Sequence, residues 1–430
     1  MKKTNKLFIG LALSFGFLGF AQQTPGAVQK EAISIVGATA HIGTGDVIEN
    51  CTLVFENGKI SAIGDESTPI KGRIIDARGK HLYPGFIAPS KSLGLIEVNQ
   101  VRASNDQDEL GDFIPNIRSI IAYNAESKVV ESLRPNGVLI GQIAPQGGII
   151  SGTSSIVQFD AWNWEDAIIK VDDGIHLNWP NSFSRGRWWA GEDRGWSPNK
   201  DYTKNIDAIK EFISNAQAYG KSEATQQNEA YKNMQGLFTG DQKLYIHAQG
   251  EKEIIDAVVS AKESGIQHMV IVGGYQSYKI IPFLKQHDIP VLIRHTHSLP
   301  VRMDDDYDLP YKLPKLLVDG GLLVGIQNAA TSNFQTRNLP FYAGQVVGQG
   351  MDKETALKLI TLNSAKILGI DKMYGSLEVG KSATLFISEG DALDMRTNVL
   401  TNAFIDGRDI SLETHQTELW QRYKEKYDKN

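Results

Sequence analysis

Apolar runs of strand length alternate with amphipathic stretches through the middle of the 430-residue chain. One amphipathic stretch spans 251–264 and places Ile254, Val258 and Ala261 close to a 3.6-residue period. Gly265 follows at a helix-stop position, so this stretch predicts a helix. Alternation of strands and helices favours βα units and a parallel sheet. The apolar runs that predict strands are 137–140, 244–247, 268–272, 290–293 and 322–326.

Both flanks of this region carry short β-type runs instead. In 31–80 the runs 52–55 and 59–63 are separated by Asn57-Gly58, a pair that favours a tight hairpin turn because both residues tolerate positive φ. The segment 375–410 shows a similar β-type pattern, in which apolar and polar positions first alternate and an apolar run then follows. The sequence pattern therefore predicts β structure at both ends of the chain.

A short apolar segment lies at the very start of the sequence. Three lysines within the first six residues precede an apolar run over 7–20, and the small residue Ala21 follows. This pattern predicts a secretory signal peptide over residues 1–21. The alternative is an N-terminal membrane anchor, for which the run is short. We therefore expect a secreted protein, in the periplasm, with no stable membrane span after cleavage.

Charge and cysteine content narrow the functional classes. The formal net charge is −6, and no long Lys/Arg block is present, so nucleic acid is not an expected partner. Cys51 is the single cysteine and has no internal partner for a disulfide. It lies in a strand-like run and is expected to be a small core residue.

The stretch 81–95 organises the rest of the chain. Pro84-Gly85 precedes the apolar pair Phe86-Ile87, and polar residues follow, so we expect the first buried strand of a parallel barrel with its carboxyl end at 88–92. Together with 361–369 and 375–381, this stretch resembles the amidohydrolase superfamily, most closely its imidazolonepropionase-like secreted branch.

The resemblance implies an α/β fold with a (β/α)8 TIM-type barrel over 81–374. It also implies a composite β-sandwich that the two flanks, 31–80 and 375–410, form together. Residues 411–430 are then a C-terminal tail.

The residues that hold the catalytic metal in this family are the main departure. The family has a His-x-His pair after the first strand, and the matching positions here are Ser90 and Ser92. Neutral hydroxyls are poor zinc ligands beside imidazole or carboxylate. The fifth strand keeps His247, but the eighth, over 325–331, ends without the expected aspartate. The resemblance thus implies a degenerate metal site, and no catalytic residue is assigned.

A relocated site for one divalent metal, zinc, is a further hypothesis. His295 and His297 end the expected seventh strand, and residues two apart on a strand point to the same face. With His247 they would offer three imidazoles, the usual number of protein ligands at a catalytic zinc. The alternative is that one histidine faces inward, held by hydrogen bonds, while the pair lies partly in a loop.

Four further residues near the expected strand ends are candidates for a pocket wall. Lys91 lies between the two serines, and Gln327 and Asn328 occupy the end of the eighth strand. An amide there can hydrogen-bond but cannot accept a proton as a base. Arg337 follows in the next loop, where it either caps the site or only positions the next helix.

One segment does not follow the alternation of strands and helices that a barrel requires. Between 162 and 196 lie six of the seven tryptophans, with Arg185, Arg187 and Arg194 among them. We predict an excursion from the barrel. Three interpretations stay open: a lid that stacks on a ligand, a protein–protein interface, or a locally packed subdomain with a tryptophan core. The six tryptophans are Trp162, Trp164, Trp179, Trp188, Trp189 and Trp196.

Two functions follow as hypotheses. The resemblance implies a hydrolase of carbon–nitrogen bonds other than peptide bonds, here with a non-standard site. The alternative is a catalytically silent barrel that binds a ligand or partners an active relative. In either case we expect a small amide-like ligand, and we consider an amidohydrolase paralogue or a second copy of the chain as partner.

Overall fold

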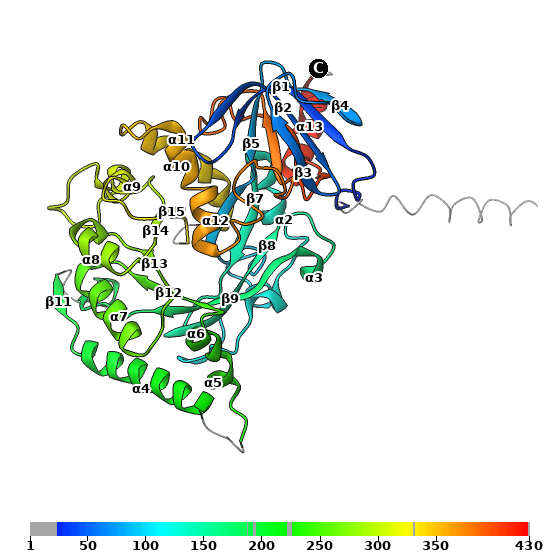
Figure 1. Cartoon of the computed structure of the whole chain (residues 1–430). Coiled ribbons are helices and arrows are strands. Elements are labelled where there is room, and N and C mark those ends of the chain that lie inside the picture. Colours follow the sequence, from blue (N-terminus) through cyan, green and yellow to red (C-terminus); the bar gives the residue numbers. More distant parts are fainter. Residues whose placement is uncertain (1–23, 187, 192–194, 222–225, 330–331, 429–430) are drawn as a thin grey trace, which may run out of the picture.

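Two sheets of eight strands organise the protein (Figure 1). The computed structural model describes residues 24–428 except 187, 192–194, 222–225 and 330–331. The predicted signal peptide, residues 1–21, lies outside the described residues. The central sheet is the barrel, and the second sheet lies beside it.

The barrel sheet has the strand order β15-β14-β13-β12-β9-β8-β7-β6. β12, β13, β14 and β15 are mostly buried apolar runs, as expected for strands covered on both faces, whereas β8 is buried but rich in serine. The end strands β6 and β15 contact each other, so the sheet curls into a nearly closed barrel. The strands are β6 (Phe86–Lys91), β7 (Val138–Ile143), β8 (Ile150–Gln158), β9 (Ile168–Asn178), β12 (Lys243–Ala248), β13 (Met269–Gly273), β14 (Val291–Arg294) and β15 (Val324–Gln327).

The prediction of an all-parallel barrel is wrong at one strand. β6 pairs with β7 in parallel, and β9, β12, β13, β14 and β15 are parallel neighbours, but β8 runs antiparallel to both β7 and β9. The connections explain this difference. Only 144–149 join β7 to β8, and 159–167 join β8 to β9. A parallel return needs a crossover of a dozen or more residues, which neither connection supplies.

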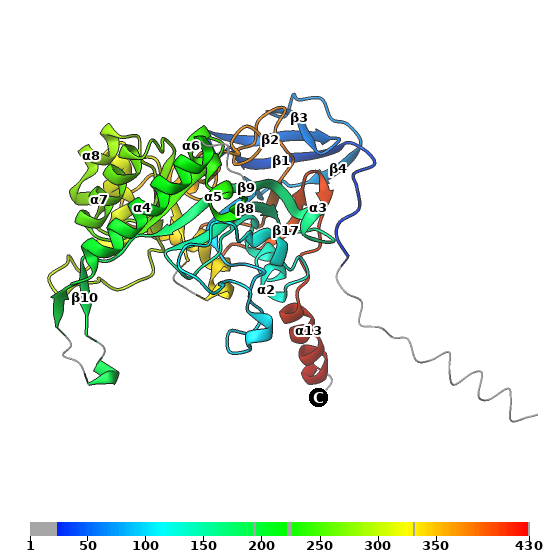
Figure 2. The same cartoon turned by 90° about the horizontal axis from the view of Figure 1, so that it is seen from below.

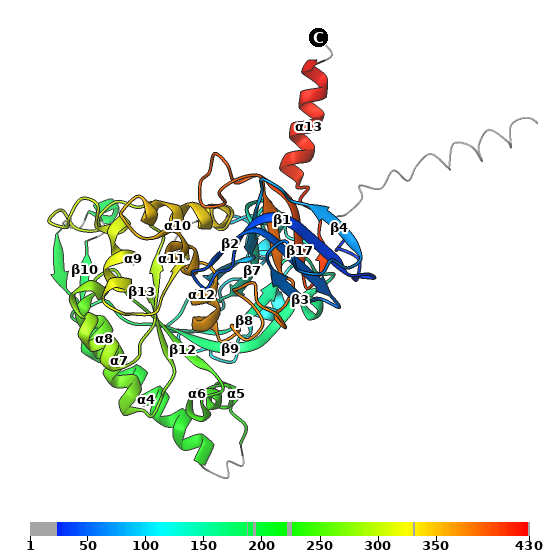
Figure 3. The same cartoon turned by 45° about the horizontal axis from the view of Figure 1, so that its top comes forward.

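Helices cover the outer side of the barrel (Figures 1 and 3). The helix predicted over 251–264 is confirmed: Ile254, Val258 and Ala261 are buried, and the chain leaves the helix at Gly265 with φ of 80°. The helices are α2 (Lys128–Glu131), α3 (Trp164–Ala167), α4 (Tyr202–Lys221), α5 (Glu229–Asn233), α6 (Gln235–Thr239), α7 (Glu251–Glu263), α8 (Ile281–Gln286), α9 (Leu309–Asp319), α10 (Leu339–Val347), α11 (Lys353–Lys358), α12 (Leu362–Leu368) and α13 (His415–Asp428).

The second sheet joins the two ends of the chain, in the order β18-β17-β16-β5-β1-β2-β3 with β4 beside β1. The predicted Asn57-Gly58 hairpin is confirmed, with φ of 52° and 77°. The strands form one hydrogen-bonded sheet, so the two-layer sandwich stays a prediction. The strands are β1 (Ile33–His41), β2 (Val47–Glu56), β3 (Lys59–Gly64), β4 (Arg73–Asp76), β5 (His81–Pro84), β16 (Leu385–Ser388), β17 (Leu400–Ile405) and β18 (Arg408–Asp409).

The tryptophan-rich segment is not one excursion. Trp179 is buried in the barrel core at the end of β9, so the first part of the segment belongs to the barrel. The second part is an arm: β10 (Phe183–Arg185) and β11 (Trp196–Pro198) pair antiparallel and extend away from the barrel (Figure 2). Trp189 and Trp196 are exposed, so a packed tryptophan core is wrong for the part of the arm that the structure describes. Arg187 and Arg194 lie outside the described residues.

The C-terminal tail is mostly helical. Helix α13 points away from the rest of the molecule (Figure 3), and its first backbone amide, at His415, donates to the Glu131 carboxylate. Within residues 24–428, leaving out the gaps named above, no helix combines the length and apolarity that crossing a membrane requires.

Candidate functional site

The carboxyl ends of the barrel strands surround a cavity of about 350 Å³. This is the face on which barrels of this type place their sites. Within the described residues no aspartate or glutamate lines the cavity, and Arg294 is its one ionic side chain. We call this cavity the mouth pocket, and its lining residues are Ser90, Ala144, Pro145, Gln146, Gly147, Asn178, His247, Gln249, Val272, Arg294, Gln327 and Ala329.

The two serines at the family's metal positions are both buried. Ser90 lines the mouth pocket, has a positive φ of 51°, and donates its backbone N–H to Gln142 Oε1 at 2.9 Å. Its Oγ has no hydrogen-bond partner within the part of the chain that the structure describes. Ser92 is held by amide side chains: its Oγ donates to Gln107 at 3.2 Å and accepts from Gln146 at 3.3 Å. Neither position offers a charged or imidazole ligand.

His247 lines the mouth pocket and pairs with a second histidine that the sequence pattern did not reveal. Its Nε2 lies 2.9 Å from Nδ1 of His176, a buried residue of β9. Burial lowers the pKa of His176 well below its usual value and lowers that of His247 to about 4. Both imidazoles are therefore neutral at pH 7. The alternation of apolar and polar positions over 174–178 was the signal that could have found His176.

The other two predicted histidines do not join them. Strand β14 ends at Arg294 and the chain then bends, so the two-residue spacing no longer keeps both side chains on one face. His295 is buried and His297 is exposed, and both rings contact Tyr342 of α10. The prediction that His295 and His297 face the mouth together is wrong. The alternative is confirmed only in part: the pair lies in a loop, but the buried His295 Nδ1 has no hydrogen-bond partner among the described residues.

The four predicted pocket residues differ in their positions. Gln327 lines the mouth pocket. Lys91 and Asn328 are buried beside it: Lys91 Nζ donates to the Asn328 carbonyl at 2.9 Å, and the Asn328 amide donates to Thr336 at 3.1 Å. Arg337 is exposed and is not in the pocket wall. Its carbonyl accepts from Asn136 at 2.8 Å, which supports a positioning role for this loop.

Burial lowers the pKa of Lys91 from 10.5 to about 8. Between these two values the unfolded chain binds the proton more tightly than the folded one, so stability rises with pH. We predict that the free energy of unfolding of the wild type, relative to Lys91→Met, increases between pH 8 and about 10.5. Urea titrations of both proteins across this range measure it. Equal pH slopes for the two proteins would contradict the assignment.

A buried polar network forms the floor under the mouth pocket. Asp173 of β9 accepts from the Tyr245 hydroxyl at 2.7 Å, from Ser154 at 2.7 Å and from Gln142 at 2.9 Å. The Gln142 side chain also receives the Ser90 amide, so the network reaches the pocket wall. Burial raises the pKa of Asp173. Asp173, the carboxylate of this network, thus accepts its hydrogen bonds from donors inside the protein.

The residues present do not fit a catalytic metal. A catalytic zinc usually takes three protein ligands and keeps an open position. Among the residues that the structure describes, no three His, Cys, Asp or Glu side chains gather as they would around a metal ion, so His247, His295 and His297 do not form the predicted three-imidazole site. The His176–His247 pair supplies two nitrogens at most, and Ser90 and Gln327 supply neutral oxygens.

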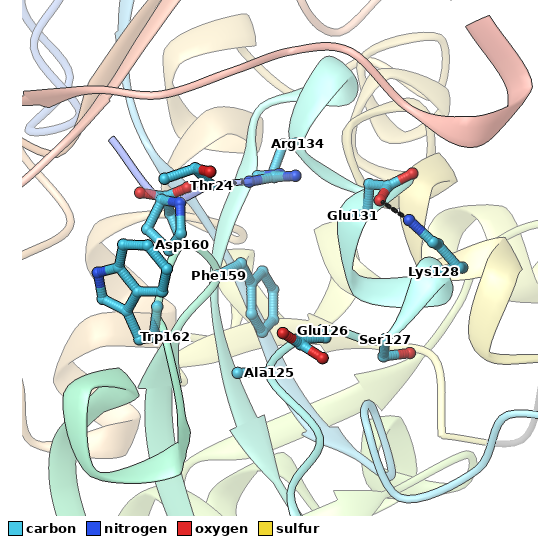
Figure 4. Close-up of a pocket in the computed structure, with 12 residues that line it drawn as sticks. Thr24, Ala125, Glu126, Ser127, Lys128, Glu131, Arg134, Phe159, Asp160 and Trp162 are labelled. Carbon is cyan, nitrogen blue, oxygen red and sulfur yellow. Dashed lines mark hydrogen bonds and ion pairs between the residues drawn. The ribbon is translucent and has the colours of Figure 1, made fainter. Parts of the chain in front are cut away.

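A second, smaller cavity of about 120 Å³ lies away from the mouth, between α2, the end of β8 and the segment that begins at Thr24 (Figure 4). Its charged groups pair with one another. Lys128 contacts Glu131 at 2.8 Å, and the buried Arg134 contacts Asp160 at 3.0 Å. Because these charges are satisfied within the protein, we interpret this cavity as a structural junction between chain segments.

Comparison with known proteins places the fold. The profile of the amidohydrolase family matches residues 318–411. The chain is 24% identical over 379 residues to a 5-methylthioadenosine/S-adenosylhomocysteine deaminase of Thermoanaerobacter pseudethanolicus, covering 80% of this chain and 82% of that one. An amidohydrolase structure from Thermotoga maritima superposes with a TM-score of 0.77 at 23% identity, over 88% and 99% of the two chains. A zinc-bound adenosine deaminase from Xanthomonas campestris has a TM-score of 0.53 at 12% identity, over 92% and 98%.

Proposed function

Because the chain belongs to the amidohydrolase superfamily, we propose that its barrel retains the ligand pocket of that fold without the metal-dependent hydrolysis of carbon–nitrogen bonds. In this proposal the mouth pocket binds a small amide-like molecule. The neutral amides of Gln146, Asn178 and Gln249 can each donate and accept hydrogen bonds there. A pocket of mixed apolar and convergent polar groups is the usual form of a small-molecule site.

The observation that carries the proposal is the chemistry of the pocket wall. Hydrolysis of an amide by this family's route needs a metal to polarise the carbonyl and a base to accept a proton from water. The wall offers a hydroxyl at Ser90, an amide at Gln327 and a neutral imidazole at His247, which is already engaged with His176. No carboxylate stands in the described wall to serve as the base.

A hydrolase with a non-standard site is the second candidate. The names of the similar proteins, a deaminase and an amidohydrolase, favour it. Its chemistry would have to run through the His176–His247 pair, whose neutral imidazoles can accept a proton. A pKa of about 4 makes His247 a weak base at pH 7.

Metal analysis and a hydrolysis screen decide between the two candidates. We expect the purified mature protein to turn over neither simple amides, dipeptides nor 5′-methylthioadenosine, with or without added zinc. Turnover that a chelator abolishes, in a protein carrying about one metal equivalent, would contradict the proposal. Turnover that a chelator leaves unchanged and His247→Ala abolishes would instead support the second candidate.

We also propose export to the periplasm, from the lysine-flanked apolar run before Ala21. The single cysteine is consistent with this: Cys51 is buried in the second sheet and needs no disulfide partner. Mass spectrometry of the N-terminus of protein recovered from the periplasm tests cleavage after Ala21.

A further inference from the structure

One positively charged side chain, Arg294, lines the mouth pocket. Arg294 lies at the end of β14, and its buried Nε has no hydrogen-bond partner within the described part of the chain. The buried Lys91 lies behind the wall, where its Nζ donates to the carbonyls of Asn328 and Ala329. Buried polar donors are nearly always paired, so an unpaired guanidinium N–H at a pocket wall indicates a missing acceptor.

Ser90 adds a second group of the same kind. Its side chain is nine-tenths or more buried, it lines the mouth pocket, and its Oγ has no partner among the described residues. A guanidinium and a hydroxyl can both donate to one anionic oxygen pair. The network carboxylate Asp173 accepts its hydrogen bonds from Tyr245, Ser154 and Gln142, and within the described residues no hydrogen bond or ion pair joins it to either group.

A larger groove of about 1,010 Å³ continues from the mouth pocket. Gln249 lines both cavities, so they meet at the end of β12. The groove is lined by Phe183 and Trp196 of the arm and by Tyr275, together with charged side chains of both signs such as Lys252 and Glu253. Phe183 and Trp196 are 48% and 55% exposed and both line the groove, so one short hairpin presents two large aromatic residues to it. They form an apolar wall beside a polar, positively charged pocket.

We propose that the mouth pocket binds the carboxylate of an elongated small molecule at Arg294, and that the groove holds an apolar or aromatic substituent of the same molecule. The inference deepens the proposed function, on which it rests, by assigning the charge and the shape of the ligand. A guanidinium matches the fork of a carboxylate. The Lys91 ammonium lies behind the wall of the mouth pocket. It adds to the positive electrostatic potential that favours an anion in a site of low dielectric.

The test uses N-(4-phenylbutanoyl)glycine and its carboxamide, two probes that differ in charge at one end. Calorimetric titration of the full mature protein should show the acid binding about tenfold more tightly than the amide, the difference that one charge-assisted hydrogen bond supplies. Arg294→Gln should abolish this preference and Arg294→Lys should keep part of it. Lys285→Gln, on the exposed side of α8, is the matched control and should leave the preference unchanged.

The groove is tested separately with N-acetylglycine, which lacks the aromatic end. Trp196→Ala should remove most of the gain in affinity that the phenylbutanoyl group brings, and Trp162→Ala, an exposed tryptophan outside the groove, should not. Melting temperatures without ligand report whether each variant is folded. Equal binding of acid and amide, no binding of either, or a preference that survives Arg294→Gln in a folded protein would overturn the inference. Hydrolysis of a probe would instead contradict the proposed function and leave the charge preference standing.

Discussion

Replacing Asp160 with asparagine is expected to lower the free energy of unfolding by about 3 to 5 kcal/mol. Asp160 is buried at the end of β8 and binds two arginines, Arg134 at 3.0 Å and Arg408 at 2.7 Å. It also accepts the backbone N–H of Gly26 at 2.8 Å. The amide would leave two guanidinium groups in a poorly solvated place without their counter-charge. Urea titration of wild type and variant measures the difference.

The reason for so large an effect is the position of Asp160 in the fold. It joins the N-terminal segment, the turn after α2 and strand β18 of the C-terminal flank to the barrel. Asp394→Asn is the matched control, because Asp394 pairs with Arg396 on the surface and no measurable change is expected there. A loss below about 1 kcal/mol for Asp160→Asn, the scale of an exposed ion pair, would show that this junction is not structural.

Asp173→Leu is expected to destabilise the barrel by about 3 kcal/mol or more, since each buried donor left without an acceptor costs about 1 to 3 kcal/mol. Three donors bind this carboxylate: the hydroxyls of Tyr245 and Ser154 and the amide of Gln142. Leucine has the same branched shape as aspartate but accepts no hydrogen bond. The measurement is again the free energy of unfolding, for purified wild type and variant side by side.

A double-mutant cycle separates the network from the general cost of a core substitution. Tyr245→Phe alone removes one donor and should cost about 1 kcal/mol. The double variant should cost less than the sum of the single ones, because without the Tyr245 hydroxyl one fewer donor is left unpaired when Asp173 is absent. Strict additivity of the two substitutions would argue that Tyr245 and Asp173 do not act as a unit.

The order of elements could be predicted from the sequence wherever burial is nearly complete. The runs at 244–247, 268–272, 290–293 and 322–326 became β12, β13, β14 and β15 because strands covered on both faces must be apolar throughout. The direction of β8 could not be predicted in this way. It depends on the lengths of the connections on either side of β8, Ile150–Gln158, a serine-rich strand. The partners of its hydroxyls include distant residues such as Asp173.

The mouth of the barrel was predictable in outline for a related reason. Strand ends converge on one face of such a sheet, so Ser90, His247 and Gln327 could be expected there. His176 and Asp173 were missed because Lys170 and Asp172 interrupt the apolar pattern in the first half of β9, and only the second half of the strand is buried. The pairing of His176 with His247 is a contact between residues 71 apart, which local pattern does not encode.

The histidines after β14 show the limit of periodicity. The two-residue repeat holds only while the backbone stays extended, and β14 ends one residue before His295. The segment 162–196 shows a second limit, since composition grouped Trp179 of the barrel core with Trp196 of an exposed arm. Both errors came from extending one local rule across an element boundary.

Zinc titration of the metal-stripped mature protein by calorimetry tests the central claim most directly. If the mouth pocket lacks a catalytic metal site, as the donors at Ser90, His247 and Gln327 indicate, no stoichiometric binding is expected, and His247→Ala should leave the titration unchanged. Tight binding of one zinc ion per chain that His247→Ala abolishes would contradict the account.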